Sequence, residues 1–244
     1  MICEPFIILP TIDSTNNYAK GLVKEGLAKD GMLIFAEEQT QGRGQKNHVW
    51  ESQKGENIIM TLIINANGLK MDAQFELSCA TALGCRDFFN IYAGDETCIK
   101  WPNDLYWRDR KAGGILIENV IKGNTWEKAI IGIGININQV DFGNMNKKPV
   151  SLKQITGKPF DAKALAMELC LFLNQRFTEL RAGCFDAQLK AYNQDLFKLN
   201  QLVAFKKGEE IFNAIVEGVN AKGQLLIKRE SSETINHGEI EWIL

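Results

Sequence analysis

The stretch TCIKWPNDLYWRDRKAGGILIE, residues 97–118, predicts three strands in succession. Its first residues have the β-branched and aromatic character of a strand, and Pro102 ends that strand because proline has no backbone N–H to give to a sheet. The Asn-Asp pair that follows favours a turn. Residues 105–118 then predict two more strands, joined by a polar loop that ends in Gly113 and Gly114. This pattern is consistent with a chain that doubles back within a sheet.

Strands and helices alternate on either side of this stretch. Residues 56–65 are almost continuously apolar and rich in isoleucine, which predicts a central strand. Residues 71–89 carry apolar side chains on one broad face, which predicts a buried helix. The spacing, caps and turn residues also predict a strand over residues 31–39, a hairpin over residues 120–138, and helices over residues 13–26, 161–183 and 185–195.

The C-terminal part of the chain has a different character. From Leu199 onward, short alternating segments separated by turn residues predict a small β barrel. We place the boundary near residue 197, which gives a first domain of residues 1–197 and a second of residues 198–244. The predicted fold class is α+β: a mixed β-sheet packed with helices, followed by the barrel.

The composition is that of an ordinary globular protein. Of the 244 residues, 45% are hydrophobic and 24% are charged, and the formal net charge of -2 gives no general basic character for binding nucleic acid. No apolar run approaches ~18 residues, so no membrane span is expected. The N-terminus lacks the charged start of a signal peptide. We therefore expect a cytoplasmic protein that binds neither nucleic acid nor a membrane.

Six cysteines and two histidines restrict the metal and disulfide chemistry. No two cysteines form a CxxC pair and most lie among apolar residues, which predicts reduced core thiols rather than a disulfide framework. His48 and His237 are too few and too far apart in sequence to predict a metal cluster.

Common phosphate-binding motifs are absent from the sequence. No stretch fits GxxxxGK(S/T), and no GxSxG or HExxH pattern occurs. The pair Gly42 and Gly44 and the pair Gly132 and Gly134 both lack the third glycine of a dinucleotide-binding fingerprint. Any anion site must therefore be built in another way.

A polar loop over residues 37–52 places Arg43 between Gly42 and Gly44. Glycine lets the backbone adopt unusual angles and approach a ligand closely. Arginine stays charged and holds a carboxylate or phosphate through two parallel hydrogen bonds. Such a loop can close over an anionic substrate and exclude water. The alternative interpretation is a β-turn with a solvated arginine.

Two lysines, Lys100 and Lys111, lie 11 residues apart, with Asn103 and Asp104 in the turn between them. If the chain doubles back there, both ammonium groups can point into one cleft. Asp104 can hold Mg²⁺, which favours one or two carboxylates together with substrate phosphates. The alternative is a surface hairpin with solvated lysines.

Two further segments place polar groups where a ligand could use them. Asn136 lies in the apolar segment of residues 132–138, where a buried polar side chain needs a partner, either a ligand or a neighbouring loop. Gly132 and Gly134 in that predicted strand indicate a bulge or something close against the backbone. Residues 13–16 are primarily a helix cap, but a helix start also offers N–H groups and hydroxyls to a polar ligand.

Taken together and in this order, these segments resemble the biotin protein ligase family. The family pattern has an early STN, a Q-x-x-GRG loop, KWPND followed by a lysine and GILxE, and a GxGIN strand. Residues 149–158 also resemble the family's segment before its last long helix, and the resemblance covers essentially the whole chain. It implies the class II aminoacyl-tRNA synthetase-like fold of biotin ligases, with an SH3-like C-terminal barrel. The matching positions are Ser14–Asn16, Gln39, Gly42–Gly44, Lys100–Asp104, Lys111, Gly114–Glu118 and Gly132–Asn136.

The resemblance implies a two-step reaction that uses ATP, biotin and Mg²⁺. The carboxylate of biotin attacks the α-phosphate of ATP to give biotinyl-5′-AMP and pyrophosphate, and a lysine of a biotin carboxyl carrier protein then takes the biotin. Arg43 and Lys111 are the implied catalytic residues, and Asp104 is the implied Mg²⁺ ligand. The implied biotin-binding residues are Ser14, Thr15, Asn16, Gln39, Gly42, Arg43, Gly44, Lys111, Gly114, Gly132 and Gly134, and the implied ATP- or adenylate-binding residues are Gln45, Trp50, Lys100, Asn103, Asp104 and Asn136.

The glycine loop departs from the family pattern. Many members continue GRG with another arginine, where this chain has Gln45. The loop then often carries a glycine, where this chain has Asn47 and His48. One phosphate contact is therefore either lost or supplied by Lys46.

Three alternatives accompany this interpretation. Some relatives carry an N-terminal helix-turn-helix domain and act as biotin-responsive repressors, but the core-like residues 6–16 begin almost at once here, so we expect the form without that domain. The chain could instead be a lipoate or octanoate protein ligase, whose arginine- and glycine-rich pattern it lacks, or a biotin-binding module without catalysis, which would need no lysine pair. Relatives often pair through edge strands, so a homodimer is a further expectation to test.

Overall fold

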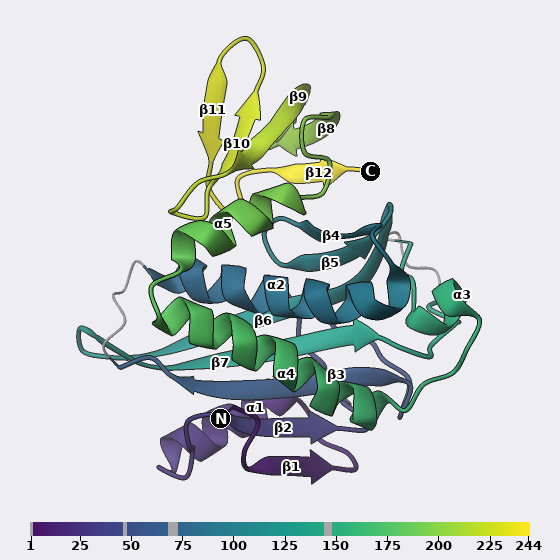
Figure 1. Ribbon diagram of the computed structural model, residues 1–244, viewed down its shortest axis with the longest axis vertical. Helices are drawn as coiled ribbons and strands as arrows, with labels where there is room; N and C mark the ends of the chain where they lie inside the picture. Colours follow the sequence, from purple (N-terminus) through teal and green to yellow (C-terminus); the bar gives the residue numbers. More distant parts are fainter. Residues whose placement is uncertain (1, 46–47, 68–72, 144–147) are drawn as a thin grey trace.

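The computed structural model describes residues 2–45, 48–67, 73–143 and 148–244 and places them in two sheets and five helices (Figure 1). The larger sheet has the strand order β1-β2-β3-β7-β6-β5-β4, with β1 and β2 parallel and the other neighbours antiparallel. It is the predicted mixed sheet, and its outer strands are β1 and β4. The strands are β1 (Phe6–Leu9), β2 (Met32–Ala36), β3 (Asn57–Asn65), β4 (Thr97–Lys100), β5 (Asp104–Trp107), β6 (Arg110–Lys122) and β7 (Thr125–Asn136).

Helices cover both faces of this sheet. α2 (Gln74–Ala93) and α4 (Ala162–Arg181) lie side by side on one face, and α5 (Phe185–Gln194) packs against both (Figure 1). α1 (Thr15–Lys24) packs against β2, β3 and β7 on the opposite face. The predicted helices are confirmed, and the Asp161 carboxylate caps α4 by accepting two backbone hydrogen bonds. Within the described ranges, these helices are too short or too polar to cross a bilayer.

The strands of the larger sheet send alternate residues to the two helical layers. In β7, Ile131 and Ile133 point into the main core beneath α2 and α4, whereas Ile130 packs beneath α1. Gly132 and Gly134 follow Ile130 on the α1 face because side chains in a strand repeat with a period of two. On the face of β7 that α1 covers, the residues therefore change from isoleucine to glycine near the N-terminal end of α1.

A second sheet follows α5. Its antiparallel strands have the order β11-β10-β9-β8-β12, and they lie beyond β4 and β5 in Figure 1. A separate small β structure at the C-terminal end was expected and is confirmed, while the boundary at residue 197 stays a prediction. Phe197 links the two sheets, because its ring centre lies 5.0 Å from that of Tyr106 in β5 and 5.7 Å from that of Trp242 in β12. The strands are β8 (Leu202–Lys207), β9 (Glu210–Val219), β10 (Leu225–Lys228), β11 (Ser232–Ile235) and β12 (Glu241–Ile243).

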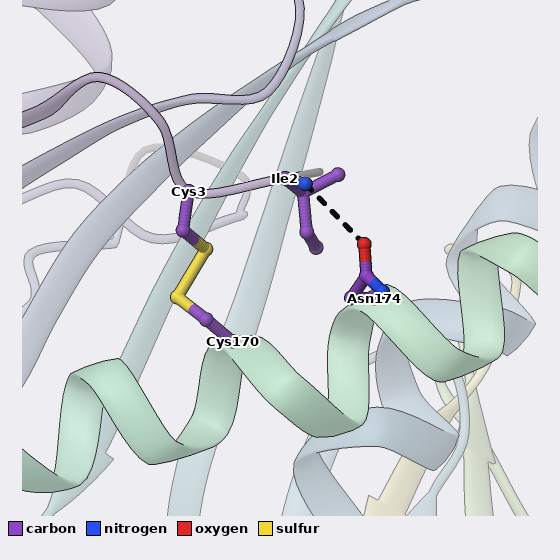
Figure 2. Close-up of a disulfide and its surroundings, with 4 residues drawn as sticks. All are labelled: Ile2, Cys3, Cys170 and Asn174. Atoms are coloured by element: carbon purple, nitrogen blue, oxygen red, sulfur yellow. Dashed lines mark hydrogen bonds between the residues drawn. A yellow bond between two sulfur atoms is a disulfide. The ribbon is translucent and has the colours of Figure 1, made fainter.

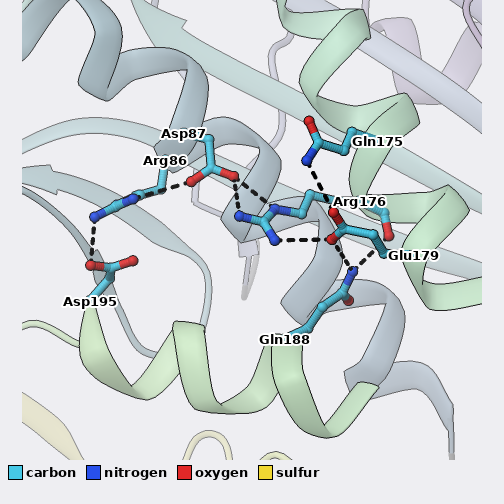
Figure 3. A network of polar contacts seen from close by, with 7 residues as sticks. All are labelled: Arg86, Asp87, Gln175, Arg176, Glu179, Gln188 and Asp195. Atoms are coloured by element: carbon cyan, nitrogen blue, oxygen red, sulfur yellow. Dashed lines mark hydrogen bonds and ion pairs between the residues drawn. The ribbon is translucent and has the colours of Figure 1, made fainter. Parts of the chain in front are cut away.

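A network of charged and amide side chains fixes α5 against α2 and α4 (Figure 3). At one end, Arg86 Nη2 of α2 lies 2.6 Å from Asp195 Oδ1, just after α5. The Asp195 carbonyl accepts a hydrogen bond from Ile99 N of β4, and Ile99 precedes Lys100. The segment that leads from α5 into the second sheet is therefore hydrogen-bonded to β4, the strand that ends at the predicted site residue Lys100. The other members of the network are Asp87, Gln175, Arg176, Glu179 and Gln188.

The predicted strand pattern is wrong in one detail and incomplete in others. Gly113 and Gly114 lie inside β6 rather than at the end of a loop, because the reversal after β5 needs only two residues. β1 and α3 (Leu152–Thr156) carry no sequence prediction, since elements this short show no clear period. The first two residues of the helix predicted over residues 71–89 lie outside the described residues.

The prediction of six reduced core thiols is wrong for three of the cysteines. Cys3 and Cys170 form a disulfide, and both are buried (Figure 2). Cys184 is exposed at the start of α5. The disulfide joins the segment before β1 to the middle of α4, where Ile2 N also donates a hydrogen bond to Asn174 Oδ1 at 3.3 Å. The two cysteines lie 167 positions apart, so their proximity follows from the packing of α4 and not from local sequence.

Candidate active site

A cavity of about 640 Å³ opens at the N-terminal end of α1 and extends to the second sheet. Its walls come from the start of α1, the glycine loop, the strands β3 to β7 and the segment around β12. Of the predicted site residues, Gly42 is the exception that does not line the cavity. Those that do are Ser14, Thr15, Asn16, Gln39, Arg43, Gly44, Gln45, Trp50, Lys100, Asn103, Asp104, Lys111, Gly114, Gly132, Gly134 and Asn136.

Glycines form the floor of the cavity. A Cβ at Gly134 would overlap the indole ring of Trp50, and a Cβ at Gly132 would overlap the side-chain amide of Asn16. Gly114 lies beside Gly134 in the register of β6 and β7. The expected close approach to the backbone is therefore confirmed, and β3 and β7 keep a regular register at these positions. Glycine is required here because a larger residue would push the overlying side chains out of place.

Neutral polar side chains form one end of the cavity and the layer directly behind it, which together we call the polar end. Ser14, Thr15, Asn16 and Gln39 line the cavity, and the buried Thr61 lies behind Thr15 and Asn16. Gln39 Oε1 accepts hydrogen bonds from Thr15 N at 2.8 Å and from Thr15 Oγ1 at 3.0 Å. Thr61 Oγ1 of β3 lies 2.7 Å from Thr15 Oγ1 and donates to Asn16 Oδ1 at 2.6 Å. Ser14 is the N-cap residue of α1, although its side chain makes no capping hydrogen bond in the described part of the chain. These side chains hold one another in place.

Glu118 of β6 contacts three side chains beside the polar end. Its carboxylate accepts hydrogen bonds from Lys20 Nζ at 2.6 Å and Asn16 Nδ2 at 3.0 Å, and it lies 3.3 Å from Arg43 Nη1. Burial alone would raise the pKa of Glu118, but hydrogen bonds from Lys20 and Asn16 and the charges of Lys20 and Arg43 outweigh burial and lower this pKa. The carboxylate is therefore ionised at neutral pH.

The glycine loop forms a small hairpin. Arg43 and Val49 pair as an antiparallel bridge. A Cβ at Gly42 would overlap the Trp50 carbonyl and come within 2.9 Å of Gln39 Nε2, so this glycine lets the hairpin close against the polar end. The buried Trp50 Nε1 has no hydrogen-bond partner among the described residues. An indole N–H in this position is available to an acceptor on a ligand.

Arg43 lies at the rim of the cavity. Its side chain is 40% exposed, and Nη1 donates a hydrogen bond to Asn17 Oδ1 at 3.1 Å in addition to the ion pair with Glu118. Arg43 is therefore both exposed and paired, and its role as an anion-binding residue stays a prediction. Lys46, the predicted substitute for a phosphate contact, lies with Asn47 outside the described residues.

Charged side chains from neighbouring strands form the other end of the cavity, which we call the charged end: Lys100, Asp104 and Lys111. Lys111 Nζ of β6 lies 2.6 Å from Asp104 Oδ1 of β5 and 5.8 Å from the centre of the Trp50 ring. Lys100 ends β4 and is only 9% exposed. The reversal predicted from the sequence therefore brings both lysines to one cavity, and the alternative of a surface hairpin with solvated lysines is wrong.

Two predicted nucleotide-binding asparagines hold the backbone in this structure. Asn103 Nδ2 donates to Ile115 O at 2.6 Å. Asn136 Nδ2 donates to Lys111 O at 3.3 Å and to Val150 O at 3.2 Å. Of the two partners expected for Asn136, a ligand or a neighbouring loop, the structure shows the loop. Asn136 thereby fixes the backbone that carries Lys111.

Sequence reasoning missed the wall that the second sheet contributes, because its residues belong to a turn and a three-residue strand and form no recognisable motif. It also left Glu118 out of the predicted site, although this residue ends the matching GILxE segment and directly follows the apolar residues 115–117. The cavity residues from the second sheet are His237, Gly238, Ile240, Glu241 and Trp242.

The two ends suit different parts of a substrate. Neutral donors and acceptors at the polar end can hold an uncharged polar ring, and the lysines at the charged end can stabilise developing negative charge. Among the residues that the structure describes, no group of three histidine, cysteine or acidic side chains could hold a metal by itself. The cavity therefore offers neutral hydrogen-bonding groups at one end and positive charge at the other.

Comparisons with known proteins agree with this geometry. The model of the biotin/lipoate A/B protein ligase family matches residues 8–136. The chain is 33% identical to the bifunctional ligase/repressor BirA of Bacillus subtilis, over 94% of this chain and 71% of that protein. It is 28% identical to a biotin–(acetyl-CoA-carboxylase) ligase of Paracoccus denitrificans, over 91% of this chain and 93% of that protein. Its structure is similar to that of the biotin protein ligase from Aquifex aeolicus in complex with biotin and ATP, with a TM-score of 0.82, 26% identity, and coverage of 98% of this chain and 99% of that one.

Proposed function

The chain belongs to the biotin/lipoate A/B protein ligase family, and we propose that it uses ATP to activate biotin and then transfers the biotin to a lysine of a biotin carboxyl carrier protein. The observation that carries this proposal is a single cavity with a neutral polar end and a charged end. The similar structure from A. aeolicus holds biotin and ATP. A substrate with a polar ring and an acidic tail fits the first end, and a nucleoside triphosphate fits the second.

The polar end favours biotin over lipoate or octanoate. The ureido ring of biotin carries two N–H donors and a carbonyl acceptor, and Thr15, Asn16 and Gln39 offer both kinds of partner. The dithiolane ring of lipoate and the alkyl chain of octanoate have no such groups. Neither of them can hydrogen-bond to these side chains, so either would displace water from polar groups without replacing its hydrogen bonds, which disfavours binding.

Arg43 and Lys111 are the proposed catalytic residues of the first step. A carboxylate oxygen of biotin attacks the α-phosphorus of ATP, the bond to the bridging oxygen breaks, and pyrophosphate leaves. Negative charge accumulates on the α-phosphate during this step, and cations already in place stabilise it. Lys111 is held within the cavity by Asp104, so it needs little movement to reach the phosphate.

Arg43 has to change partners during this step. Its guanidinium binds Asn17 and Glu118 at the rim of the cavity. We infer that the biotin carboxylate, and later the adenylate phosphate, replace these partners through two parallel hydrogen bonds. The exposure of Arg43 and the glycines that flank it in sequence support such a movement.

The second step needs no nucleophile from the protein. The amine of a carrier lysine attacks the acyl carbon of biotinyl-5′-AMP, an amide forms, AMP leaves, and the amine loses a proton. Adenylation makes this step possible because AMP is a much better leaving group than the oxygen of a free carboxylate. The biotin carboxyl carrier protein of a biotin-dependent carboxylase is therefore the proposed partner.

Mg²⁺ is the remaining component that the family implies. The carboxylate of Asp104 at the charged end fits it, since Mg²⁺ is commonly held by one or two carboxylates together with substrate phosphates. Asp104 Oδ1 already lies 2.6 Å from Lys111 Nζ, so the ion and this lysine would share one carboxylate. When bound, Mg²⁺ neutralises part of the charge on the phosphates.

Exchange of labelled pyrophosphate into ATP tests the proposal. We expect exchange that depends on biotin, followed by biotinylation of an added carrier domain, detected with avidin after electrophoresis. If lipoate or octanoate drives the exchange instead, the chain is a lipoate or octanoate ligase and not a biotin ligase. Binding of biotin without any exchange would indicate a non-catalytic binding module.

A role in DNA binding is not part of this proposal. The B. subtilis relative is a bifunctional ligase and repressor, but the net charge of -2 gives this chain no general basic character. We propose a cytoplasmic ligase that binds no DNA. Sequence-specific retardation of a DNA fragment in a gel at low salt would contradict this.

A further inference from the structure

Thr61 is the only polar residue in the run of residues 58–64 in β3. It is fully buried and lies opposite Gly132 in the register of β3 and β7. A valine would have nearly the same shape, so packing alone does not explain the hydroxyl. A buried hydroxyl is unfavourable unless it is hydrogen-bonded, and this one lies 2.7 Å from Thr15 Oγ1 and 2.6 Å from Asn16 Oδ1. Thr61 therefore acts on the residues that line the cavity from the layer behind them.

The side-chain amides on either side of this contact have fixed orientations. The ionised Glu118 only accepts hydrogen bonds, and Asn16 Nδ2 donates to its Oε2 at 3.0 Å. If the Asn16 amide were reversed, its oxygen would face the carboxylate, which would repel it. Asn16 Oδ1 therefore points to Thr61. In the same way, Thr15 N can only donate, so it fixes Gln39 Oε1 as its acceptor at 2.8 Å.

Two hydroxyl groups thus lie in a row between two acceptors. The oxygen atoms in order are Asn16 Oδ1, Thr61 Oγ1, Thr15 Oγ1 and Gln39 Oε1, with separations of 2.6, 2.7 and 3.0 Å. Each hydroxyl has a single proton. The Thr61 proton points to Asn16 Oδ1, and the Thr15 proton points to Thr61 Oγ1 or to Gln39 Oε1. Both protons are used within the row, so Thr15 presents only lone pairs to the cavity.

We propose that Thr61 is a positioning residue that makes Thr15 a hydrogen-bond acceptor, so that the polar end selects a ligand with a ring N–H at this point. Without the Thr61 hydroxyl, Thr15 can turn its proton toward the cavity by giving up a single hydrogen bond of 3.0 Å to Gln39. The preference for an N–H donor would then be lost. The inference rests on the proposed function, since it takes the ureido ring of biotin as the ligand.

Two analogues of biotin test this selectivity. In each, an oxygen atom replaces one of the two ring N–H groups, which gives a cyclic carbamate with an acceptor in place of a donor. Where that oxygen faces Thr15, two acceptors meet. We expect wild type to bind such a carbamate about 100-fold more weakly than biotin, as measured by calorimetry. In Thr61→Val this ratio should fall to about tenfold or less for one of the two carbamates, because Thr15 can donate to the new oxygen.

Two further variants separate this role from a general loss of structure. Thr61→Ser keeps the hydroxyl and should keep the wild-type ratios. Thr81→Val is the matched control, because Thr81 is fully buried in α2 and its hydroxyl donates to Leu77 O at 2.7 Å. This variant loses the same group away from the cavity, so its ratios should also equal those of wild type.

Thermal unfolding of each variant checks the fold. If Thr61→Val does not fold, Thr61→Cys decides in its place, because a thiol is only a weak donor and should give a ratio between those of Thr61→Ser and biotin itself.

The inference is overturned if wild type binds both carbamates as tightly as biotin, because the polar end would then recognise no N–H group. It is also overturned if Thr61→Val, or Thr61→Cys in its place, keeps the wild-type ratios for both carbamates. A fall in Thr61→Ser or Thr81→Val as large as that in Thr61→Val would overturn it as well. A wild-type protein without biotin-dependent exchange would instead refute the proposed function.

Discussion

The polar end and the charged end of the cavity are held by different interactions. At the polar end, neutral side chains from the start of α1, the glycine loop and β3 bind one another through hydrogen bonds of 2.6 to 3.0 Å. At the charged end, Lys111 is held by a carboxylate and Lys100 by aromatic rings, one of which comes from the second sheet. The polar end is built by the larger sheet together with α1 and the glycine loop, whereas the charged end also has contacts from the second sheet.

If the proposed function holds, this difference separates recognition of biotin from catalysis of adenylation. Neutral hydrogen-bonding groups select a ligand by shape and by the pattern of donors and acceptors, and substitutions there should act on biotin binding. Preorganised charges act on the transition state, so substitutions at the charged end should act on the rate of adenylation. The predictions below test that separation.

Loss of Lys111 should have the largest effect. In Lys111→Gln the cation nearest the cavity floor disappears and Asp104 loses its partner. We expect the rate of biotinyl-5′-AMP formation in a single turnover to fall by a factor of about 10² to 10³, the usual cost of losing a preorganised electrostatic group. Lys122→Gln, at the exposed end of the same strand, is the control and should react like wild type. A loss of less than threefold in Lys111→Gln would remove this lysine from the catalytic step.

A methyl group added to the cavity floor should have the second largest effect. In Gly132→Ala the added Cβ would overlap the Asn16 amide, so the polar end would have to rearrange. We expect biotin to bind about 10 to 100 times more weakly, since a displacement of ~1 Å in a binding group commonly costs that much. Gly21→Ala is the control, because a Cβ there meets no atom within 4 Å. Unchanged biotin affinity in Gly132→Ala, measured by calorimetry, would place the biotin ring elsewhere.

Removal of the Glu118 charge should have a smaller effect, and one that depends on pH. The folded protein lowers the pKa of Glu118 below its usual value of 4.5. The ionised carboxylate therefore stabilises the fold fully above about that pH, and the contribution is lost as the pH falls through the lower, folded value. At pH 7, Glu118→Gln should be less stable than wild type by roughly 1–2 kcal/mol, the worth of hydrogen bonds to a charged group.

Urea unfolding of both proteins across the acid range measures this pH dependence. The difference in free energy of unfolding should shrink below about pH 4.5, the usual carboxyl value. A difference that stays constant down to pH 3, or that grows as the pH falls, contradicts the assigned pKa direction.

Reduction of the Cys3–Cys170 disulfide should affect the site least. The bond ties the N-terminal segment to α4, and neither cysteine lines the cavity. We expect a reducing agent to lower the melting temperature, because the unfolded chain gains freedom, while both KM values change less than twofold. A selective change in either KM on reduction would show that the two ends are less isolated from the N-terminal segment than the structure implies.

The sequence predicted the main elements of both ends because local patterns encode them. The reversal after Pro102 and the positions of Gly132 and Gly134 follow from proline and glycine chemistry, and the structure brings Lys100 and Lys111 to one cavity as expected. The close packing of the floor was predictable for the same reason, since glycine within a strand points to something against the backbone. The assignment of individual residues to biotin or to ATP stays a prediction.

Other features depend on long-range packing and left no local pattern. Trp242 reaches Lys100 only because the second sheet packs beside β4 and β5. Gly113 lies inside β6 because the chain reverses over only two residues after β5. The run of polar residues before Gly113 suggested a longer loop instead. Cys3 meets Cys170 only after α4 has packed on the sheet. Each of these three features depends on contacts between distant segments, and the periodicity of a single sequence does not reveal such contacts.

The most direct test of the account is to mix the protein with biotin and ATP labelled at the α-phosphate and to analyse the protein-bound material by chromatography and mass spectrometry. We expect one labelled compound that contains both biotin and adenylate, formed rapidly by wild type and Lys122→Gln and slowly by Lys111→Gln. Label that appears only with lipoate or octanoate, or that forms equally fast without Lys111, would contradict it.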